Sequence, residues 1–141
     1  EGSPNIERGT FFKILQNAGG TLNANTSFDR TFYYETLPSH YLELGLYMES
    51  ERMLHAKIDS IGIATQKEVV KEEKRTRIDN QPYMSFQAEI FGAAFKGTPY
   101  SWTPIGSFED IDAATDADFK DFFQTFYVPN NATLAVAGDI N

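Results

Sequence analysis

Two adjacent glycines, Gly19 and Gly20, separate a helical pattern from strand-forming residues, and this boundary constrains the fold more than any other feature. Before them, residues 9–18 predict a short helix, which a following glycine ends by accepting a left-handed backbone. After them, residues 21–27 and 30–37 are rich in Thr, Tyr and Phe and are joined by a short turn. The sequence therefore predicts a helix followed by a β-hairpin.

The rest of the chain is mostly helical by pattern. A long helix is expected to open at Ser39, with Ser39 as its cap, and to be interrupted at residues 61–63. Further helices are expected over residues 64–78, 83–95, 107–113 and 116–126, and an apolar strand over residues 132–137. These elements predict an α+β fold, a mainly antiparallel sheet packed by helices, in a single domain covering residues 1–141.

Composition excludes several classes of function. Hydrophobic residues make up 41% of the 141 residues, which is enough for a packed core. The formal net charge of −8 argues against nucleic acid or an anionic membrane surface as a partner. The absence of cysteine excludes disulfides and thiolate metal sites. No run of about twenty apolar residues is present, so no membrane span is predicted.

The common catalytic motifs are absent from the sequence. The two histidines, His40 and His55, are fifteen residues apart, whereas zinc-binding histidine pairs lie about one helical turn apart. Neither is assigned a ligand role, and both are expected to be surface or packing residues. The sequence also lacks a phosphate-binding glycine loop and a G-x-S-x-G nucleophile turn. Alone, the chain contains no complete catalytic constellation.

The charged run at residues 66–75 is the unusual segment. Glu73 follows Val69 by four residues and is expected near a buried helix edge, and Gln66 lies two turns before Glu73 on the same face. A carboxylate at such an edge must be paired or bind a metal. The alternative is a solvated, salt-bridged face, with Glu73 pairing to Arg77. Glu68 and Lys71 form a second such pair in this interpretation.

Several segments, taken in order, resemble the insulinase/pitrilysin family of zinc metallopeptidases. The segment Gly19 to Thr31 is similar to the family's G-G-x-x-N-A-x-T-S…T hairpin, and residues 66–73 to its E-R-x-V-V-x-E-E helix. Residues 49–53, 99–106 and 126–139 resemble further landmarks in the same order. The matching segments cover nearly the whole chain, and the similarity is greatest to bacterial members.

The resemblance implies zinc as the cofactor. Family members bind zinc through both histidines of an H-x-x-E-H motif and a glutamate on a later helix, and the glutamate within the motif is the general base. Glu73 matches the later glutamate, with Glu72 as the alternative if the alignment is shifted by one residue. Gln66 matches a supporting position that is often glutamate; its neutral amide keeps hydrogen bonding but loses charge.

The resemblance also places the H-x-x-E-H motif a few residues before Gly2, so the chain is expected to begin just past it and to be inactive alone. Asn23, Ala24 and Asn25 match the strand edge that binds a peptide substrate as an added strand. An ordinary edge strand is the alternative. A second homologous half domain is the expected partner, and exposed apolar surface is expected on this piece.

Three functions follow from these expectations. The first is a fragment of a zinc endopeptidase or oligopeptidase, in the bacterial periplasm or cell envelope. The second is a non-catalytic homologue that serves as the structural or partner half of such a peptidase. The third is a free-standing peptide-binding module. The retained Glu73 and the hairpin favour the first function, and Gln66 and the missing H-x-x-E-H motif favour the second.

Overall fold

The computed structural model describes residues 2–140, which divide into two compact units. The first unit comprises the residues up to 25, residues 32–59 and the residues from 117 onward. The second comprises residues 26–31 and 60–116. Each unit has its own packing and is described separately.

Helix α1 (Phe11–Asn17) of the first unit ends at the two glycines, as predicted. Gly19 has a φ of +77°, and its N–H donates to the carbonyl of Gln16 at 2.9 Å. The N–H of Gly20 donates to the carbonyl of Leu15 at 2.8 Å. This pair of bonds is a Schellman motif, which satisfies carbonyls that the helix end would otherwise leave unpaired.

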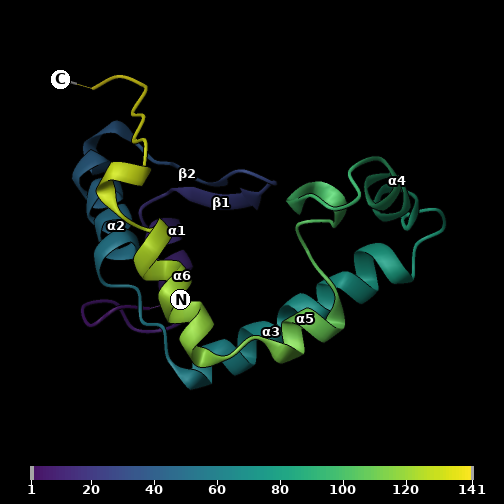
Figure 1. Ribbon diagram of the computed structural model, residues 1–141. Coiled ribbons are helices and arrows are strands. Elements are labelled where there is room, and N and C mark those ends of the chain that lie inside the picture. Colours follow the sequence, from purple (N-terminus) through teal and green to yellow (C-terminus); the bar gives the residue numbers. More distant parts are fainter. Residues whose placement is uncertain (1, 141) are drawn as a thin grey trace. The chain divides into compact units, whose positions relative to one another are not determined.

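The hairpin consists of β1 (Thr21–Thr26) and β2 (Thr31–Thr36), which form a two-stranded antiparallel sheet (Figure 1). The N–H of Ser27 donates to the carbonyl of Arg30 at 2.9 Å and closes the turn. The two predicted strand segments are therefore confirmed, each to within one residue at its ends.

Helix α2 (Leu42–Leu54) follows a short 3₁₀ turn, η1 (Ser39–Tyr41). Ser39 lies within this turn and makes no side-chain cap bond, so its predicted capping role is wrong: the preceding Pro38 already sets the chain direction. α2 packs on α1 through a small core. Its most buried members are Ile6, Phe11, Leu15 and Met48.

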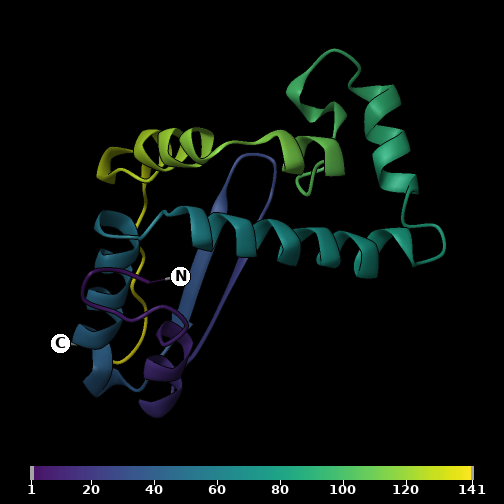
Figure 2. The ribbon, with the colours of Figure 1, turned by 90° about the horizontal axis from the view of Figure 1, so that it is seen from below.

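The second unit is built on α3 (Ser60–Lys74), which continues as a π-helical turn, η2 (Arg75–Asp79) (Figure 2). The predicted interruption at residues 61–63 is wrong, because α3 begins at Ser60 and the chain is non-helical at residues 55–59 instead. Ile63 is 6% exposed. The burial of Ile63 holds this segment in the helix. Gly62 does not break it, because a single glycine lowers helix stability by only about 1 kcal/mol.

The remaining elements of the second unit are α4 (Phe86–Ala94), η3 (Pro99–Ser101) and α5 (Phe108–Ala113). The ring of Phe28, in the hairpin turn, lies 5.2 Å from that of Phe91 and 5.3 Å from that of Tyr100. The hydroxyl of Tyr100 donates to Asp29 at 2.7 Å. Helix α4 starts three residues later than predicted, because Tyr83 has a φ of +67° and cannot belong to a right-handed helix.

Helix α6 (Asp116–Phe126) has the predicted bounds, and a 3₁₀ turn, η4 (Pro129–Asn131), follows it. The predicted strand at residues 132–137 is wrong: within the described part of the chain this segment has no regular structure. A strand needs a neighbour's backbone hydrogen bonds, and among residues 2–140 the sheet contains only β1 and β2. Leu134 is 68% exposed. The expected exposed apolar surface is therefore present.

Candidate functional site: the acidic helix and the Glu51 cluster

The charged run forms the C-terminal half of α3, where Glu73 carries a partly exposed carboxylate. The Glu73 side chain is 40% exposed, and one of its oxygens lies 2.8 Å from Nη1 of Arg77. Glu72 is 69% exposed, and its carboxylate lies 3.3 Å from Nη1 of Arg75. The predicted pairing of Glu73 with Arg77 is confirmed. Each candidate carboxylate therefore has one arginine partner, in an ion pair that water can reach.

The predicted buried edge beside Glu73 is not present in the structure. Val69, the residue that was expected to define it, is 51% exposed. Val69, Glu72, Glu73, Thr76 and Arg77 line an open depression on the surface. The expectation failed because α3 contacts α5 through its lysines, which leaves Val69 uncovered.

Three lysines, Lys67, Lys71 and Lys74, lie on one face of α3 and contact α5 or the residues beside it. Nζ of Lys71 lies 2.7 Å from Oδ1 of Asp112. Nζ of Lys67 donates to the carbonyl of Asp112 at 3.1 Å and to that of Ala114, where α5 ends. A cation at a helix C-terminus is electrostatically favourable because the carbonyls there carry partial negative charge.

Lys71 and Asp112 strengthen each other's charge. The hydrogen bond to Asp112 raises the pKa of Lys71, and a hydrogen bond to Glu68 adds to this effect. The same bond to Lys71 lowers the pKa of Asp112. Lys71 also lies 2.7 Å from Oε1 of Glu68, which confirms the second predicted pair on α3.

A zinc ion needs three protein ligands in a catalytic site. Among residues 2–140 no group of three His, Cys, Asp or Glu side chains could hold a metal ion. Glu73 nevertheless fits one ligand position. Its carboxylate is partly exposed, and its ion pair with Arg77 can be reached by water. Gln66, two turns earlier on α3, is exposed.

The predicted peptide-binding edge, Asn23 to Asn25, lies in β1 and is exposed. In the described residues β1 is paired only with β2, so its other edge carries no strand. The side-chain carbonyl of Asn23 accepts a hydrogen bond from the N–H of Ala24 at 2.8 Å. An unpaired strand edge can accept an extended peptide, although ordinary edge strands share this feature.

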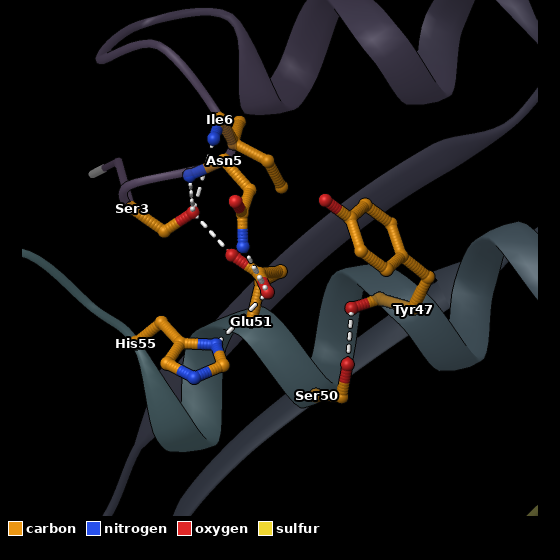
Figure 3. Close-up of polar contacts among 7 residues, drawn as sticks. All are labelled: Ser3, Asn5, Ile6, Tyr47, Ser50, Glu51 and His55. Atoms are coloured by element: carbon orange, nitrogen blue, oxygen red, sulfur yellow. Dashed lines mark hydrogen bonds and ion pairs between the residues drawn. The ribbon is translucent and has the colours of Figure 1, made fainter.

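The sequence did not reveal a second polar cluster, which is centred on Glu51 of α2 (Figure 3). Glu51 is 4% exposed and accepts hydrogen bonds from the hydroxyl of Ser3 and from Nδ2 of Asn5, the latter at 3.0 Å. Nδ1 of His55 lies 2.9 Å from the same carboxylate. The bond from Ser3 is the largest cause of a lowered pKa for Glu51. The cluster fastens the N-terminal segment to α2.

This cluster does not have the geometry of a serine hydrolase site. A catalytic histidine must lie between the hydroxyl and the carboxylate to take the hydroxyl proton. Here the Glu51 carboxylate lies between Ser3 and His55. His55 is 48% exposed at its side chain, and His40 is exposed beside the Tyr41 ring. Both histidines are therefore the surface residues that the sequence predicted.

Glu35 of β2 is the most unusual ionisable group in the first unit. Its side chain is 8% exposed, and neither carboxylate oxygen has a hydrogen-bond partner among the described residues. Burial is the main cause of a pKa raised to about 8, and the nearby Glu49 raises it further. Arg52 lies 3.9 Å from Glu35 but is engaged closely by Glu49, at 3.1 Å. One guanidinium thus serves two carboxylates.

An apolar cavity of about 330 Å³ lies in the same unit. Aromatic side chains dominate its lining: Phe11, Tyr33, Phe119, Phe122, Phe123 and Tyr127. The guanidinium of Arg52 stacks 4.2 Å from the centre of the Tyr33 ring, and the hydroxyls of Tyr33 and Tyr127 are 2.6 Å apart. Arg52 and the two tyrosine hydroxyls thus add polar groups to a lining that is otherwise mainly aromatic.

A family model described as Insulinase (Peptidase family M16) matches residues 1–106 of this chain. The chain belongs to this family. It is 37% identical over 137 residues to zinc protease PqqE of Helicobacter pylori, covering 97% of this chain and 31% of the relative. It is 29% identical over 135 residues to the probable zinc protease PqqL of Escherichia coli, covering 94% of this chain and 14% of the relative.

Two solved structures place this M16 chain within the fold of the family. It aligns with a protease from Helicobacter pylori at a TM-score of 0.89 and 35% identity, over 93% of this chain and 32% of that one. The first half of the periplasmic protease PqqL from Escherichia coli aligns at a TM-score of 0.78 and 20% identity, over 93% of this chain and 29% of that one. The predicted α+β class and insulinase-type half-domain fold are confirmed.

The M16 chain thus spans about a third of the length of these Helicobacter proteins. In residues 2–140 no helix combines the length and the apolar character needed to cross a bilayer.

Proposed function

We propose that this chain is part of a zinc-dependent endopeptidase or oligopeptidase, with Glu73 as a zinc ligand. The observation that carries the proposal is the partly exposed Glu73 carboxylate on α3, in the run that resembles the family's ligand helix. Membership of the M16 family and the relatives named as zinc proteases support it. Zinc, when bound, supplies a water of lowered pKa and polarises the scissile carbonyl.

In this proposal the residues of the chain bind and orient. Glu73 supplies one carboxylate ligand, and Gln66 supports the site through its amide. The other ligands and the general base come from an H-x-x-E-H motif elsewhere in the protein. The isolated chain is therefore expected to bind zinc weakly and to cleave nothing, since a single carboxylate cannot fill a catalytic zinc's three protein positions.

Peptide substrate is proposed to add as a strand along the free edge of β1, at Asn23, Ala24 and Asn25. Main-chain hydrogen bonds of this kind are sequence-tolerant, which suits a peptidase that accepts varied peptides. A second homologous half domain is the proposed partner, supported by the solved structure described as the first half of PqqL. PqqL is a periplasmic protease, which supports a periplasmic or envelope location for this protein.

The ligand assignment is tested in the full-length protein by comparing E73Q with E72Q. Metal analysis should show that E73Q loses most of its zinc, because an amide is a poor zinc ligand, and that E72Q keeps it. Unchanged zinc in E73Q would refute the assignment, and loss in E72Q alone would move the ligand to Glu72.

The second candidate is a non-catalytic homologue that keeps the fold as a structural or partner half. Gln66 favours it, because a neutral amide replaces the carboxylate that the family often has there. The protein sequence that precedes Glu1 distinguishes the two. An H-x-x-E-H motif within about ten residues supports the peptidase, and the absence of both histidines supports the non-catalytic half.

A further inference from the structure

We propose that the Lys71–Asp112 salt bridge clamps α3 to α5 and thereby positions Glu73, which makes Lys71 a positioning residue of the active site. The inference rests on the proposed function, because it takes Glu73 to be a metal ligand. It adds a role for α5, which contributes no ligand of its own.

The clamp extends along the C-terminal half of α3 and into the start of η2. Near its C-terminal end, Nζ of Lys74 and the guanidinium of Arg75 each lie 5.2 Å from the centre of the Phe108 ring. In the middle, Lys71 contacts Asp112 at 2.7 Å. One turn earlier, Lys67 donates to the carbonyls where α5 ends. A cation–π contact, a salt bridge and a helix-end contact therefore fix one face of α3.

Lys71 is the central element of this clamp. Its side chain is only 13% exposed although it carries a charge, whereas Asp112 is 62% exposed. A largely covered ammonium group requires partners, and both partners of Lys71 are carboxylates at 2.7 Å. Only Asp112 lies outside α3 and can hold the helix in place.

The geometry of a helix connects this clamp to Glu73. Glu73 follows Lys71 by two residues, so the two side chains leave the helix about 200° apart. Fixing the lysine face against α5 therefore directs Glu73 to the opposite side, where its contact is Arg77 at 2.8 Å. A rotation of α3 by roughly 10° moves a group about 6 Å from the helix axis by about 1 Å.

Such a displacement exceeds what a metal site tolerates. Ligand distances in zinc sites vary by about 0.2 Å, and misplacement by about 1 Å can reduce a rate about 100-fold. The clamp thus gives a physical reason for the lysines in this run. A solvated helix face would not require lysines at these positions.

The test is a double-mutant cycle in the full-length protein, with the zinc dissociation constant measured by chelator competition well below each variant's thermal midpoint. K71M and D112N are each expected to weaken zinc binding about 10-fold, and the double variant no further, because both remove the same contact. If K71M does not fold, D112N alone carries the test. In K71M and D112N, kcat on a peptide substrate should fall while KM stays nearly unchanged.

E68Q is the matched control, because Glu68 contacts the same ammonium group at the same 2.7 Å but belongs to α3 itself. Zinc affinity in E68Q should stay within about twofold of the parent protein, since its contact does not join two helices. Equal losses in E68Q and D112N would overturn the clamp. So would unchanged zinc affinity in D112N when E73Q has lost its zinc. If E73Q itself keeps zinc, the ligand assignment fails first and the inference with it.

Discussion

Arg77 holds the carboxylate of Glu73 at 2.8 Å, and Arg75 holds that of Glu72 at 3.3 Å. The two pairs start from adjacent residues of α3, and both arginines lie in the π-helical turn that follows. Each arginine therefore neutralises one of the two candidate ligands, and the pairs give an independent way to distinguish them.

The substitution R77Q is expected to raise the zinc affinity of the full-length protein by about twofold, because exposed helix pairs are worth about 0.3–0.5 kcal/mol. Zinc must displace this arginine from Glu73. R75Q is the matched comparison: it frees Glu72 and removes a contact with Phe108, so it should not raise the affinity. Competition with a chromogenic chelator measures both. A rise in R75Q with none in R77Q would indicate that Glu72 is the ligand.

The sequence contained enough information for the elements that depend on local chemistry. The Schellman motif at Gly19 follows from the backbone freedom of glycine, and the hairpin follows from strand-forming residues on both sides of a turn. The pairing of Glu73 with Arg77 follows from helical spacing. Each of these depends on residues that are close together along the chain.

What the sequence could not supply were contacts between distant residues. Lys71 and Asp112 are 41 residues apart, and nothing in the charged run indicates that Lys71 is covered while Val69 is exposed. Glu51 and Ser3 are 48 apart. The predicted strand at 132–137 failed for the same reason, because strand formation depends on a neighbour and not on the apolar run alone.

Substitution of Glu35 should change how the stability of the protein depends on pH. Its pKa is about 8 in the folded state against 4.5 for an ordinary glutamate, so the folded state favours the protonated form. That stabilisation is full below about pH 4.5 and is lost as pH rises through 8. E35Q mimics the protonated acid, so its stability relative to the parent protein should rise over this interval by on the order of a few kcal/mol.

Urea unfolding at pH 5 and pH 9 checks this expectation. The variant E43Q is the control, because Glu43 is exposed in the first turn of α2. E43Q removes the same charge from a site where it is not buried, so a pH dependence found only in E35Q is due to burial. The burial argument is wrong if E35Q and E43Q behave alike at both values.

Acid should release the N-terminal segment through Glu51. The pKa of Glu51 is lowered, chiefly by the hydrogen bond from Ser3. Its ionised carboxylate therefore stabilises the folded state above the pKa of an unfolded glutamate. This stabilisation is lost as pH falls through the pKa of Glu51 in the folded state. S3A removes that bond and should move the loss to higher pH. Hydrogen exchange of the Ile6 amide, which donates to the Ser3 hydroxyl at 3.0 Å, reports the release in the parent protein. S3A lacks that acceptor, so for this variant the exchange of residues 2–8 is measured as a group across pH. S50A is the control, because the hydroxyl of Ser50 donates to the carbonyl of Tyr47 within α2.

Two glycines inside helices should respond in opposite ways to the same substitution. A Cβ on Gly45 of α2 would lie 3.0 Å from Cδ1 of Leu37 and 3.4 Å from Oε2 of Glu35. Because Leu37 and Glu35 are packed beneath the helix, G45A should destabilise the protein by about 1–3 kcal/mol.

A Cβ on Gly92 of α4 would meet its nearest atom, the carbonyl oxygen of Ser101, at 3.7 Å, an ordinary contact. G92A should therefore be neutral or stabilising by up to about 1 kcal/mol, because alanine is the better helix former. Thermal unfolding of both variants distinguishes close packing at Gly45 from a general effect of glycine. A similar change in both would show that Gly45 is not required to make room for Leu37 and Glu35.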